Sequence, residues 1–296
     1  MTSMAAEQPA VLRRGGLVER DGILHRVGQA KVSAYRRRWE DEAEEDHVRS
    51  AIAGGQTARV DYETLTGKIA PVWSRFPRGR RFGTVLEVGS GYGRIPLYLA
   101  REREVTWSTY CAVDISETML RRFAEYRKRF APAPASRLYR VCVSAEELPL
   151  EDDSVDLALT SAVFLHMGKS FVARAVAEIA RTLKPGGDFL FDVSFPNARN
   201  PPNLLPRLKP RRFRPPHFMK YWTRSEVEAL LAGTGLAAKA GGVMIEPGAW
   251  ALLPKRVGPV PVPLARRANR AVEAAPARLH DLVAASYTVH STGLLA

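Results

Sequence analysis

The residues best suited to chemistry lie in the stretch VLEVGSGYG, Val85 to Gly93, which contains a run of strand-forming residues followed by three glycines. The glycines stand at positions 89, 91 and 93. Glycine lets backbone N–H groups approach a ligand where a Cβ atom would collide with it. The carboxylate of Glu87, two residues before the first glycine, suits a diphosphate poorly and a positively charged group well. The stretch therefore predicts a binding site for a ligand that carries a cation.

A second acidic residue, Asp114, ends the strand-like run YCAVD, 21 residues after Gly93. At the carboxyl end of a second parallel strand, such a side chain accepts hydrogen bonds from the hydroxyls of a ribose. A ribose without a required diphosphate points to a nucleoside that carries an amino-acid or sulfonium group. S-adenosylmethionine fits that description.

The elements that must position these residues are short β-rich runs that alternate with amphipathic segments. Strands are predicted at residues 84–88, 107–113, 138–143, 155–161 and 188–194, and helices at 92–102, 117–129 and 170–183. This alternation predicts an α/β fold with a doubly wound, mostly parallel sheet. Residues 237–245 and 286–292 are expected to add two strands, the last of them antiparallel, which gives a seven-stranded Rossmann-like sheet. Helices are also expected at 32–53 and 61–75, and residues 1–30 are weakly patterned.

Four stretches in this order resemble the motifs of class I S-adenosylmethionine-dependent methyltransferases of the type 11-like group. LEVGSGYG resembles the family's E/D-x-G-x-G-x-G, and VDIS resembles its ribose-binding acid. SAEELPLEDDSVDL resembles the adenine-binding turn and fourth strand, and LKPGG resembles the turn before the fifth strand. The resemblance covers residues 84–194 and implies a Rossmann-like methyltransferase whose cofactor is S-adenosyl-L-methionine.

The resemblance also implies a role for each matching residue. Glu87 is expected to hold the methionine end of the cofactor, Asp114 its ribose and Ile115 its adenine. Ser144 stands where the family often has Asp. The cofactor-binding residues implied in this way are Glu87, Gly89, Ser90, Gly91, Gly93, Asp114, Ile115, Ser144, Ala145, Glu146 and Ser161.

Catalysis of methyl transfer needs little from the protein beyond positioning, because the leaving group is already cationic and activated. A general base is required only where the acceptor arrives protonated. The candidate base is His166 in VFLHM, since histidine titrates near working pH; a hydrogen-bonded wall histidine is the alternative interpretation. No metal site is expected, because no acidic cluster follows the fourth strand. The absence of a [DN]-P-P-[YF] motif and of a Pro-Cys motif argues against methylation of adenine or glutamine amines and against the cysteine route to 5-methylcytosine.

Domain boundaries follow from where the alternation begins. Residues 1–56 are expected to form an N-terminal helical or irregular extension, and residues 57–296 the methyltransferase domain. Substrate-side insertions are expected at 195–222 and 247–284, the first of them as a long loop. Its basic residues suit an anionic acceptor; they are Arg207, Lys209, Arg211, Arg212 and Arg214.

The sequence thus predicts a cytoplasmic, bacterial-type enzyme that methylates an O or C atom of a small molecule or of a glycan or lipid intermediate. No run of 18 apolar residues is present in the 296-residue chain, so no transmembrane segment is expected, although peripheral membrane contact stays open. The net charge of +13 keeps an RNA methyltransferase as an alternative. The second alternative is a protein that binds the cofactor without catalysing transfer.

Overall fold

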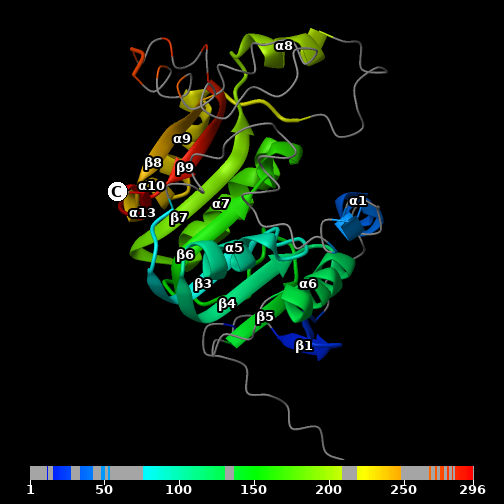
Figure 1. Cartoon of the computed structure of the whole chain (residues 1–296). Coiled ribbons are helices and arrows are strands. Elements are labelled where there is room, and N and C mark those ends of the chain that lie inside the picture. Colours follow the sequence, from blue (N-terminus) through cyan, green and yellow to red (C-terminus); the bar gives the residue numbers. More distant parts are fainter. Residues whose placement is uncertain are drawn as a thin grey trace, which may run out of the picture.

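The computed structural model describes residues 12, 16–27, 34–42, 48–50, 53, 76–130, 137–208, 219–247, 267, 271, 274–276, 279, 282 and 284–295. Its strands form one nine-stranded sheet in the order β1-β2-β5-β4-β3-β6-β7-β9-β8 (Figure 1). The strands are β1 (Leu17–Arg20), β2 (Ile23–Arg26), β3 (Arg81–Val88), β4 (Thr106–Asp114), β5 (Arg137–Cys142), β6 (Val155–Ser161), β7 (Leu183–Pro196), β8 (Gly242–Pro247) and β9 (Ala284–His290). The helices are α1 (Ala34–Glu42), α5 (Arg94–Glu102), α6 (Glu117–Phe130), α7 (Lys169–Thr182), α8 (Pro201–Leu208), α9 (Arg224–Gly233), α10 (Leu236–Lys239) and α13 (Thr292–Leu295).

The predicted doubly wound, mostly parallel sheet is confirmed, but the described residues form nine strands where seven were predicted, because β1 and β2 extend one edge of the sheet. Strands β5, β4, β3, β6 and β7 pair in parallel, and β9 runs antiparallel to both β7 and β8. From β3 the chain continues to β4 on one side, while β6 lies on the other side of β3. The crevice at the carboxyl ends of strands flanking such a switch point is where open α/β sheets bind ligands.

The core has two layers because successive side chains of a strand point to opposite faces of the sheet. On β3, Leu86 packs with residues of α7 and α9 in one apolar cluster. The preceding residue, Val85, packs with residues of α5 and α6 in the other. Helices therefore cover both faces of the sheet.

The N-terminal region contains a β-hairpin, which differs from the helical or irregular extension expected there. Strands β1 and β2 are antiparallel and are joined by Asp21 and Gly22, whose φ angles are 52° and 71°. Two successive positive φ angles with an Asp-Gly sequence are typical of a type I′ hairpin turn. Because β2 also pairs in parallel with β5, the hairpin extends the sheet edge. The predicted domain boundary between residues 56 and 57 lies outside the described residues.

Other predicted segments agree with the structure only in part. The predicted loop 195–222 contains the helix α8, which begins with two prolines at positions that need no N–H partner. Of the predicted helix 32–53, α1 and residues 48–50 and 53 are helical in the described part. The predicted helix 61–75 and most of the predicted insertion 247–284 lie outside the described residues.

Candidate cofactor site and active site

A cavity of about 560 Å³ lies at the carboxyl edge of β3, β4 and β6. Its wall also includes residues of α1, α5, α6 and α7. Most of the candidate residues from the sequence line it: Glu87, Gly89, Ser90, Gly91, Asp114, Ile115, Ala145, Ser161 and His166. The described positions of Gly93, Ser144 and Glu146 lie outside this wall.

The glycine loop after β3 is held in place by β4, because Gly89 N and Ser90 N both donate to Val113 O, at 2.8 and 3.0 Å. Gly91 has a φ of 51°, and a Cβ atom built on it would meet nothing within 4 Å. Since Gly91 lines the cavity, that open space belongs to the cavity itself. Its backbone can therefore come close to a ligand, which a side chain at this position would prevent.

Gly93 packs against helix α6. It has a φ of 90° and directly precedes α5, and a Cβ atom on it would lie 2.8 Å from Phe123 Cδ2 of α6. The third glycine therefore allows the loop to pack against α6, and it is not among the residues that line the cavity.

Glu87 is the most deeply buried carboxyl group of the cavity wall, with 1% of its surface exposed. The hydroxyl of Tyr110 donates to its Oε2 at 2.8 Å. Burial raises the pKa of Glu87 to about 8, although the Tyr110 hydrogen bond and the charge of Arg94 oppose this shift. The shift favours the protonated form of this carboxyl group, and a cationic group placed beside it would favour its ionised form.

Asp114 joins the glycine loop to the start of α6. Its Oδ2 accepts from Gly91 N at 2.8 Å and its Oδ1 from Ser116 N at 2.9 Å. Burial raises the pKa of Asp114 to about 6, against the effect of these two hydrogen bonds. Each carboxylate oxygen has more than one lone-pair site, so each retains capacity for a hydroxyl donor from a ligand.

On the expected adenine side, Ile115 and Ala145 line the cavity, but their neighbours Ser144 and Glu146 do not. The Ser144 hydroxyl donates a hydrogen bond to the Glu146 carboxylate at 3.4 Å and accepts one from the Glu146 backbone N–H at 3.5 Å. Glu146 is also paired with Arg174 of α7. These contacts explain why the side chains of Ser144 and Glu146 stay outside the wall.

At the other end of the cavity, β6 ends in Ser161, whose hydroxyl donates to Asp192 Oδ2 at 3.2 Å. Ala162 follows with a φ of 57°, a left-handed conformation that costs roughly 1 kcal/mol for a residue with a side chain. The chain then forms the 3-10 helix Phe164–His166. The His166 ring meets the ring of Trp39 with centroids 5.7 Å apart and an interplanar angle of 61°, and both rings line the cavity.

Sequence reasoning missed two residues that stand out in the wall, Trp39 and Arg94. Arg94 immediately follows the last glycine and begins α5, and its charge lowers the pKa of Glu87. Its place directly after the glycine motif was a usable signal. Trp39 belongs to α1, and only the general assignment of the N-terminal helices to the substrate side pointed to it.

The residues present fit a cofactor with a cationic amino-acid end and a ribose. Ser90 Oγ is buried and lacks a hydrogen-bond partner within the described part of the chain. Gly91 leaves open space beside it, and Glu87 and Asp114 provide the two carboxyl groups. Buried polar groups without a partner are rare in folded proteins and call for a ligand or water.

Comparisons with known proteins agree with this fold. Residues 86–191 match the family described as "Methyltransferase domain". The chain is 28% identical over 163 residues to the dimethylglycine N-methyltransferase of Parasynechococcus marenigrum, which covers 51% of this chain and 55% of that protein. It is 33% identical over 109 residues to the malonyl-[acyl-carrier protein] O-methyltransferase of Methylococcus capsulatus, which covers 37% of this chain and 36% of that protein. The structure of phosphoethanolamine N-methyltransferase 2 of Haemonchus contortus in complex with S-adenosyl-L-methionine superposes with a TM-score of 0.52 at 15% identity, covering 88% of this chain and 59% of that one.

The fold and the match over residues 86–191 are those of class I S-adenosylmethionine-dependent methyltransferases, a class whose cofactor is S-adenosyl-L-methionine. The chain spans about half, or less, of the length of the two curated relatives named above. None of the described helices is long and apolar enough to cross a membrane. Within the same residues, no three His, Cys, Asp or Glu side chains are grouped so that they could hold a metal ion.

Proposed function

We propose that this chain transfers a methyl group from S-adenosylmethionine to a small-molecule acceptor that binds beside His166 and Trp39. The observation that carries the proposal is that one cavity joins three kinds of group. Glu87 and the glycine loop suit a cationic amino-acid end, Asp114 suits a ribose, and the Trp39 and His166 rings form a further wall. A volume of about 560 Å³ lies within the range of small-molecule and cofactor sites.

The cofactor-side residues have separable tasks in this proposal. Glu87 accepts a hydrogen bond from the ammonium group of the methionine moiety, and Arg94 at the start of α5 pairs with its carboxylate. Asp114 accepts the ribose hydroxyls, while Ile115 and Ala145 pack against the adenine. When bound, S-adenosylmethionine supplies a methyl group that is already activated by a sulfonium leaving group. The protein then acts mainly by holding the acceptor in line with that methyl group.

His166 is the candidate general base for an acceptor that arrives protonated. Its ring lines the cavity on the 3-10 helix that follows β6 and is packed edge-on against Trp39. The sequence-based prediction of an O or C acceptor atom is kept as part of the proposal. The relatives named above are N-methyltransferases of dimethylglycine and phosphoethanolamine and an O-methyltransferase, which supports a small acceptor, and the acceptor atom is to be identified by experiment.

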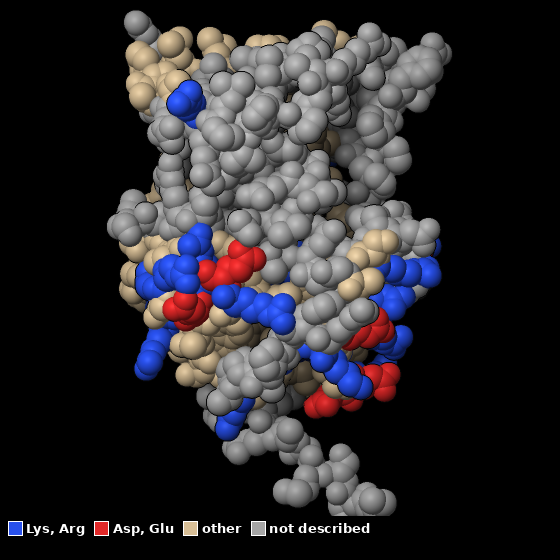
Figure 2. Space-filling model, viewed as in Figure 1, with Lys and Arg blue, Asp and Glu red and all other residues tan. Residues whose placement is uncertain are grey.

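The RNA alternative has less support from the described residues. Figure 2 shows Asp and Glu side chains next to Lys and Arg side chains on the face in view. Ion pairs such as Arg26 with Glu147 and Arg181 with Asp152 offset part of the positive charge locally. Four of the five basic loop residues, Lys209, Arg211, Arg212 and Arg214, lie outside the described residues. We therefore favour a small acceptor and use RNA as a comparison in the test.

The test is a transfer assay with S-adenosylmethionine labelled in its methyl group. The purified protein is given a small-molecule fraction of cell extract, total RNA or buffer alone, and labelled products are identified by mass spectrometry. Label in a small molecule supports the proposal, and label in RNA alone contradicts it. Cofactor binding without label in any fraction would instead support the non-catalytic alternative.

Replacement of His166 by Gln tests the base once an acceptor is known. Loss of the acidic limb of the pH–rate profile is expected, because the neutral imidazole is the form that accepts a proton. An unaltered profile in this variant would assign His166 to the wall of the cavity only.

A further inference from the structure

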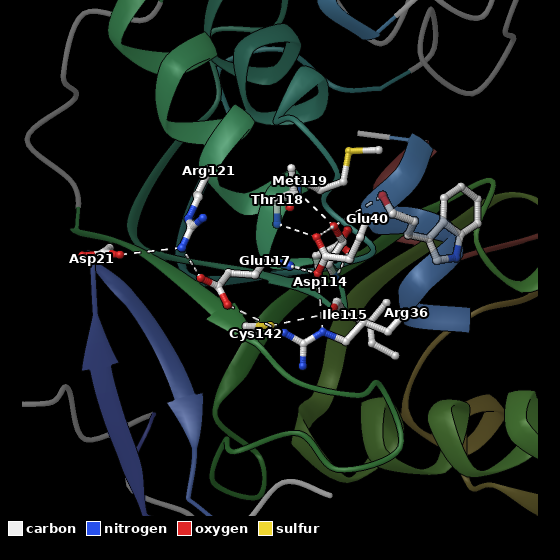
Figure 3. Close-up of polar contacts among 12 residues, drawn as sticks. Asp21, Arg36, Glu40, Asp114, Ile115, Glu117, Thr118, Met119, Arg121 and Cys142 are labelled. Carbon is white, nitrogen blue, oxygen red and sulfur yellow. Dashed lines mark hydrogen bonds and ion pairs between the residues drawn. The ribbon is translucent and has the colours of Figure 1, made fainter. Parts of the chain in front are cut away.

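Helix α1 is attached to the start of α6 through one carboxylate, that of Glu40. Oε1 of Glu40 accepts from Glu117 N at 2.9 Å, and Oε2 accepts from Thr118 N at 3.0 Å and from the hydroxyl of Ser116 at 3.1 Å. Figure 3 shows the Glu40 carboxylate pointing from α1 towards this first turn of α6. The first N–H groups of a helix have no partner inside the helix, so Glu40 supplies partners for two of them from a distant part of the chain.

The electrostatics of this contact favour the charged form of Glu40. Burial disfavours a charged carboxylate, but the hydrogen bonds from Thr118, Glu117 and Ser116 outweigh it, so the pKa of Glu40 lies below its usual value. A negative charge at a helix N-terminus is also favoured by the helix dipole. Arg36 of the same helix α1 approaches both Glu40, at 3.4 Å, and Glu117, at 3.7 Å, and so balances the two acidic groups.

The turn that Glu40 holds is the one that carries Asp114. Ser116 N donates to Asp114 Oδ1 at 2.9 Å, and Met119 N donates to the Ser116 hydroxyl at 3.0 Å. Asp114 Oδ2 in turn accepts from Gly91 N. A continuous series of hydrogen bonds therefore leads from the glycine loop through Asp114 and Ser116 to Glu40 on α1.

The residue before Glu40 reaches the cavity from the same helix. Trp39 lines the cavity and meets the His166 ring edge-on, with centroids 5.7 Å apart. The position of α1 thus decides whether Trp39 completes the wall beside His166. The Glu40 hydrogen bonds to the start of α6, at 2.9 to 3.1 Å, are shorter than two other polar contacts between α1 and this turn, the 3.4 Å bond from the Ser116 hydroxyl to Trp39 O and the 3.7 Å contact of Arg36 with Glu117.

We propose that Glu40 is a positioning residue that couples cofactor binding at Asp114 to the docking of α1 over the cavity. The inference rests on the proposed function, since it takes the cavity to be the S-adenosylmethionine site. By linkage, if docking of α1 strengthens cofactor binding, cofactor binding must strengthen docking of α1 by the same factor. Glu40 acts through the Asp114 turn and through Trp39, and it does not itself line the cavity.

The experiment compares the wild type with Glu40→Ala and Glu40→Gln. The matched control is Glu125→Gln. Glu125 lies on α6, the helix that Glu40 contacts, and its exposed carboxylate pairs with Arg122 at 3.0 Å. Calorimetric titration gives the Kd of S-adenosylmethionine for each protein. Acrylamide quenching of tryptophan fluorescence, with and without cofactor, gives the accessibility of Trp39, which is assigned by difference from Trp39→Phe.

The expected result is that cofactor protects Trp39 from quenching in the wild type and in Glu125→Gln. In Glu40→Ala the protection is lost and the Kd rises about tenfold, because charge-assisted hydrogen bonds at the Asp114 turn are removed. Glu40→Gln retains an amide oxygen that can accept one of these bonds, so its values are expected to lie between the two. If Glu40→Ala fails to fold, the Kd and the quenching of Glu40→Gln test the inference.

A lower melting temperature with unchanged Kd and unchanged protection in Glu40→Gln or Glu40→Ala would reduce Glu40 to a structural contact and overturn the inference. Failure of the wild type to bind S-adenosylmethionine would overturn the proposed function, and this inference with it. The two failures are therefore distinguished by the wild-type titration alone.

Discussion

Glu87 is unfavourable for stability when it ionises, and its proposed role in binding a cation would offset that cost. Burial raises its folded pKa to about 8, above the ordinary value of 4.5 that applies in the unfolded chain. Between these two pH values the folded state holds a proton that the unfolded state has released, so this group makes the protein less stable as pH rises through the window. Such a group is tolerated where a ligand cation compensates for its ionisation.

We therefore expect Glu87→Gln to be more stable than the wild type at pH 9, on the order of 1–3 kcal/mol, and similar to it at pH 5. The amide keeps the shape and can still accept from Tyr110, but it cannot ionise. Urea unfolding at the two pH values checks this, with cofactor titration at pH 7.5 to show weaker binding by the same variant. Parallel pH dependence in variant and wild type would contradict the assignment of the raised pKa to Glu87.

Asp114 is expected to contribute to binding through its ionised form. Asp114→Ala should weaken binding of S-adenosylmethionine by roughly 1–3 kcal/mol, because two ribose hydroxyls lose an acceptor. Since burial raises the pKa of Asp114 to about 6, wild-type affinity should fall as pH drops through 6. Titrations between pH 5 and 8 should show that this fall is absent in Asp114→Ala. Equal affinity of variant and wild type would remove the ribose assignment.

At the scale of elements, predictability followed the strength of the local pattern. Strand–helix alternation over residues 84–194 predicted β3 to β7 and the helices between them closely, because periodicity of apolar residues is a direct consequence of burial on one or two faces. The β1–β2 hairpin was missed although its Asp21–Gly22 turn is a strong local signal. The helix α8 was missed because prolines were taken as a loop marker, whereas proline is also accepted in the first turn of a helix.

The glycine loop shows why a motif does not reveal the task of each of its members. From sequence, the three glycines were given one common role beside the cofactor. In the structure, Gly91 faces open cavity space, while Gly93 faces the Phe123 ring of α6. The difference depends on where α6 packs, which no local pattern encodes.

This difference predicts that replacement of glycine by alanine has different effects at positions 91 and 93. Gly91→Ala should weaken cofactor binding at least tenfold and cost only about 1 kcal/mol of stability, because its Cβ atom projects into the cavity from a left-handed residue. Gly93→Ala should lose more stability than that, since the same strain is joined by a 2.8 Å approach to Phe123. Denaturant unfolding and calorimetric titration of both variants provide the check. Equal losses of stability would contradict the separate roles.

At the scale of the whole molecule, the cavity gathers residues from Trp39 on α1 to Phe171 on α7. Sequence motifs located the part of the wall that follows consecutive strands, because the carboxyl ends of parallel strands meet at one edge. They did not locate Trp39, whose place in the wall depends on a contact between α1 and the start of α6 across 76 to 78 positions of the chain. Long-range contacts of this kind leave no periodic trace in the sequence.

Because the cavity wall draws on α1, the sheet and α7 together, cofactor binding should stabilise these elements as one unit. At a concentration of one hundred times Kd, a ligand that binds only the folded state adds about 2.7 kcal/mol. For a domain of this size that corresponds to a rise in melting temperature of roughly 4–6 °C. Differential scanning calorimetry with S-adenosylmethionine measures the rise, and hydrogen exchange should show slower exchange in α1 as well as in the glycine loop. Asp114→Ala at the same cofactor concentration is the control, with a smaller shift expected. If cofactor slows hydrogen exchange in the strands alone and leaves exchange in α1 unchanged, α1 is not part of the cofactor-bound unit.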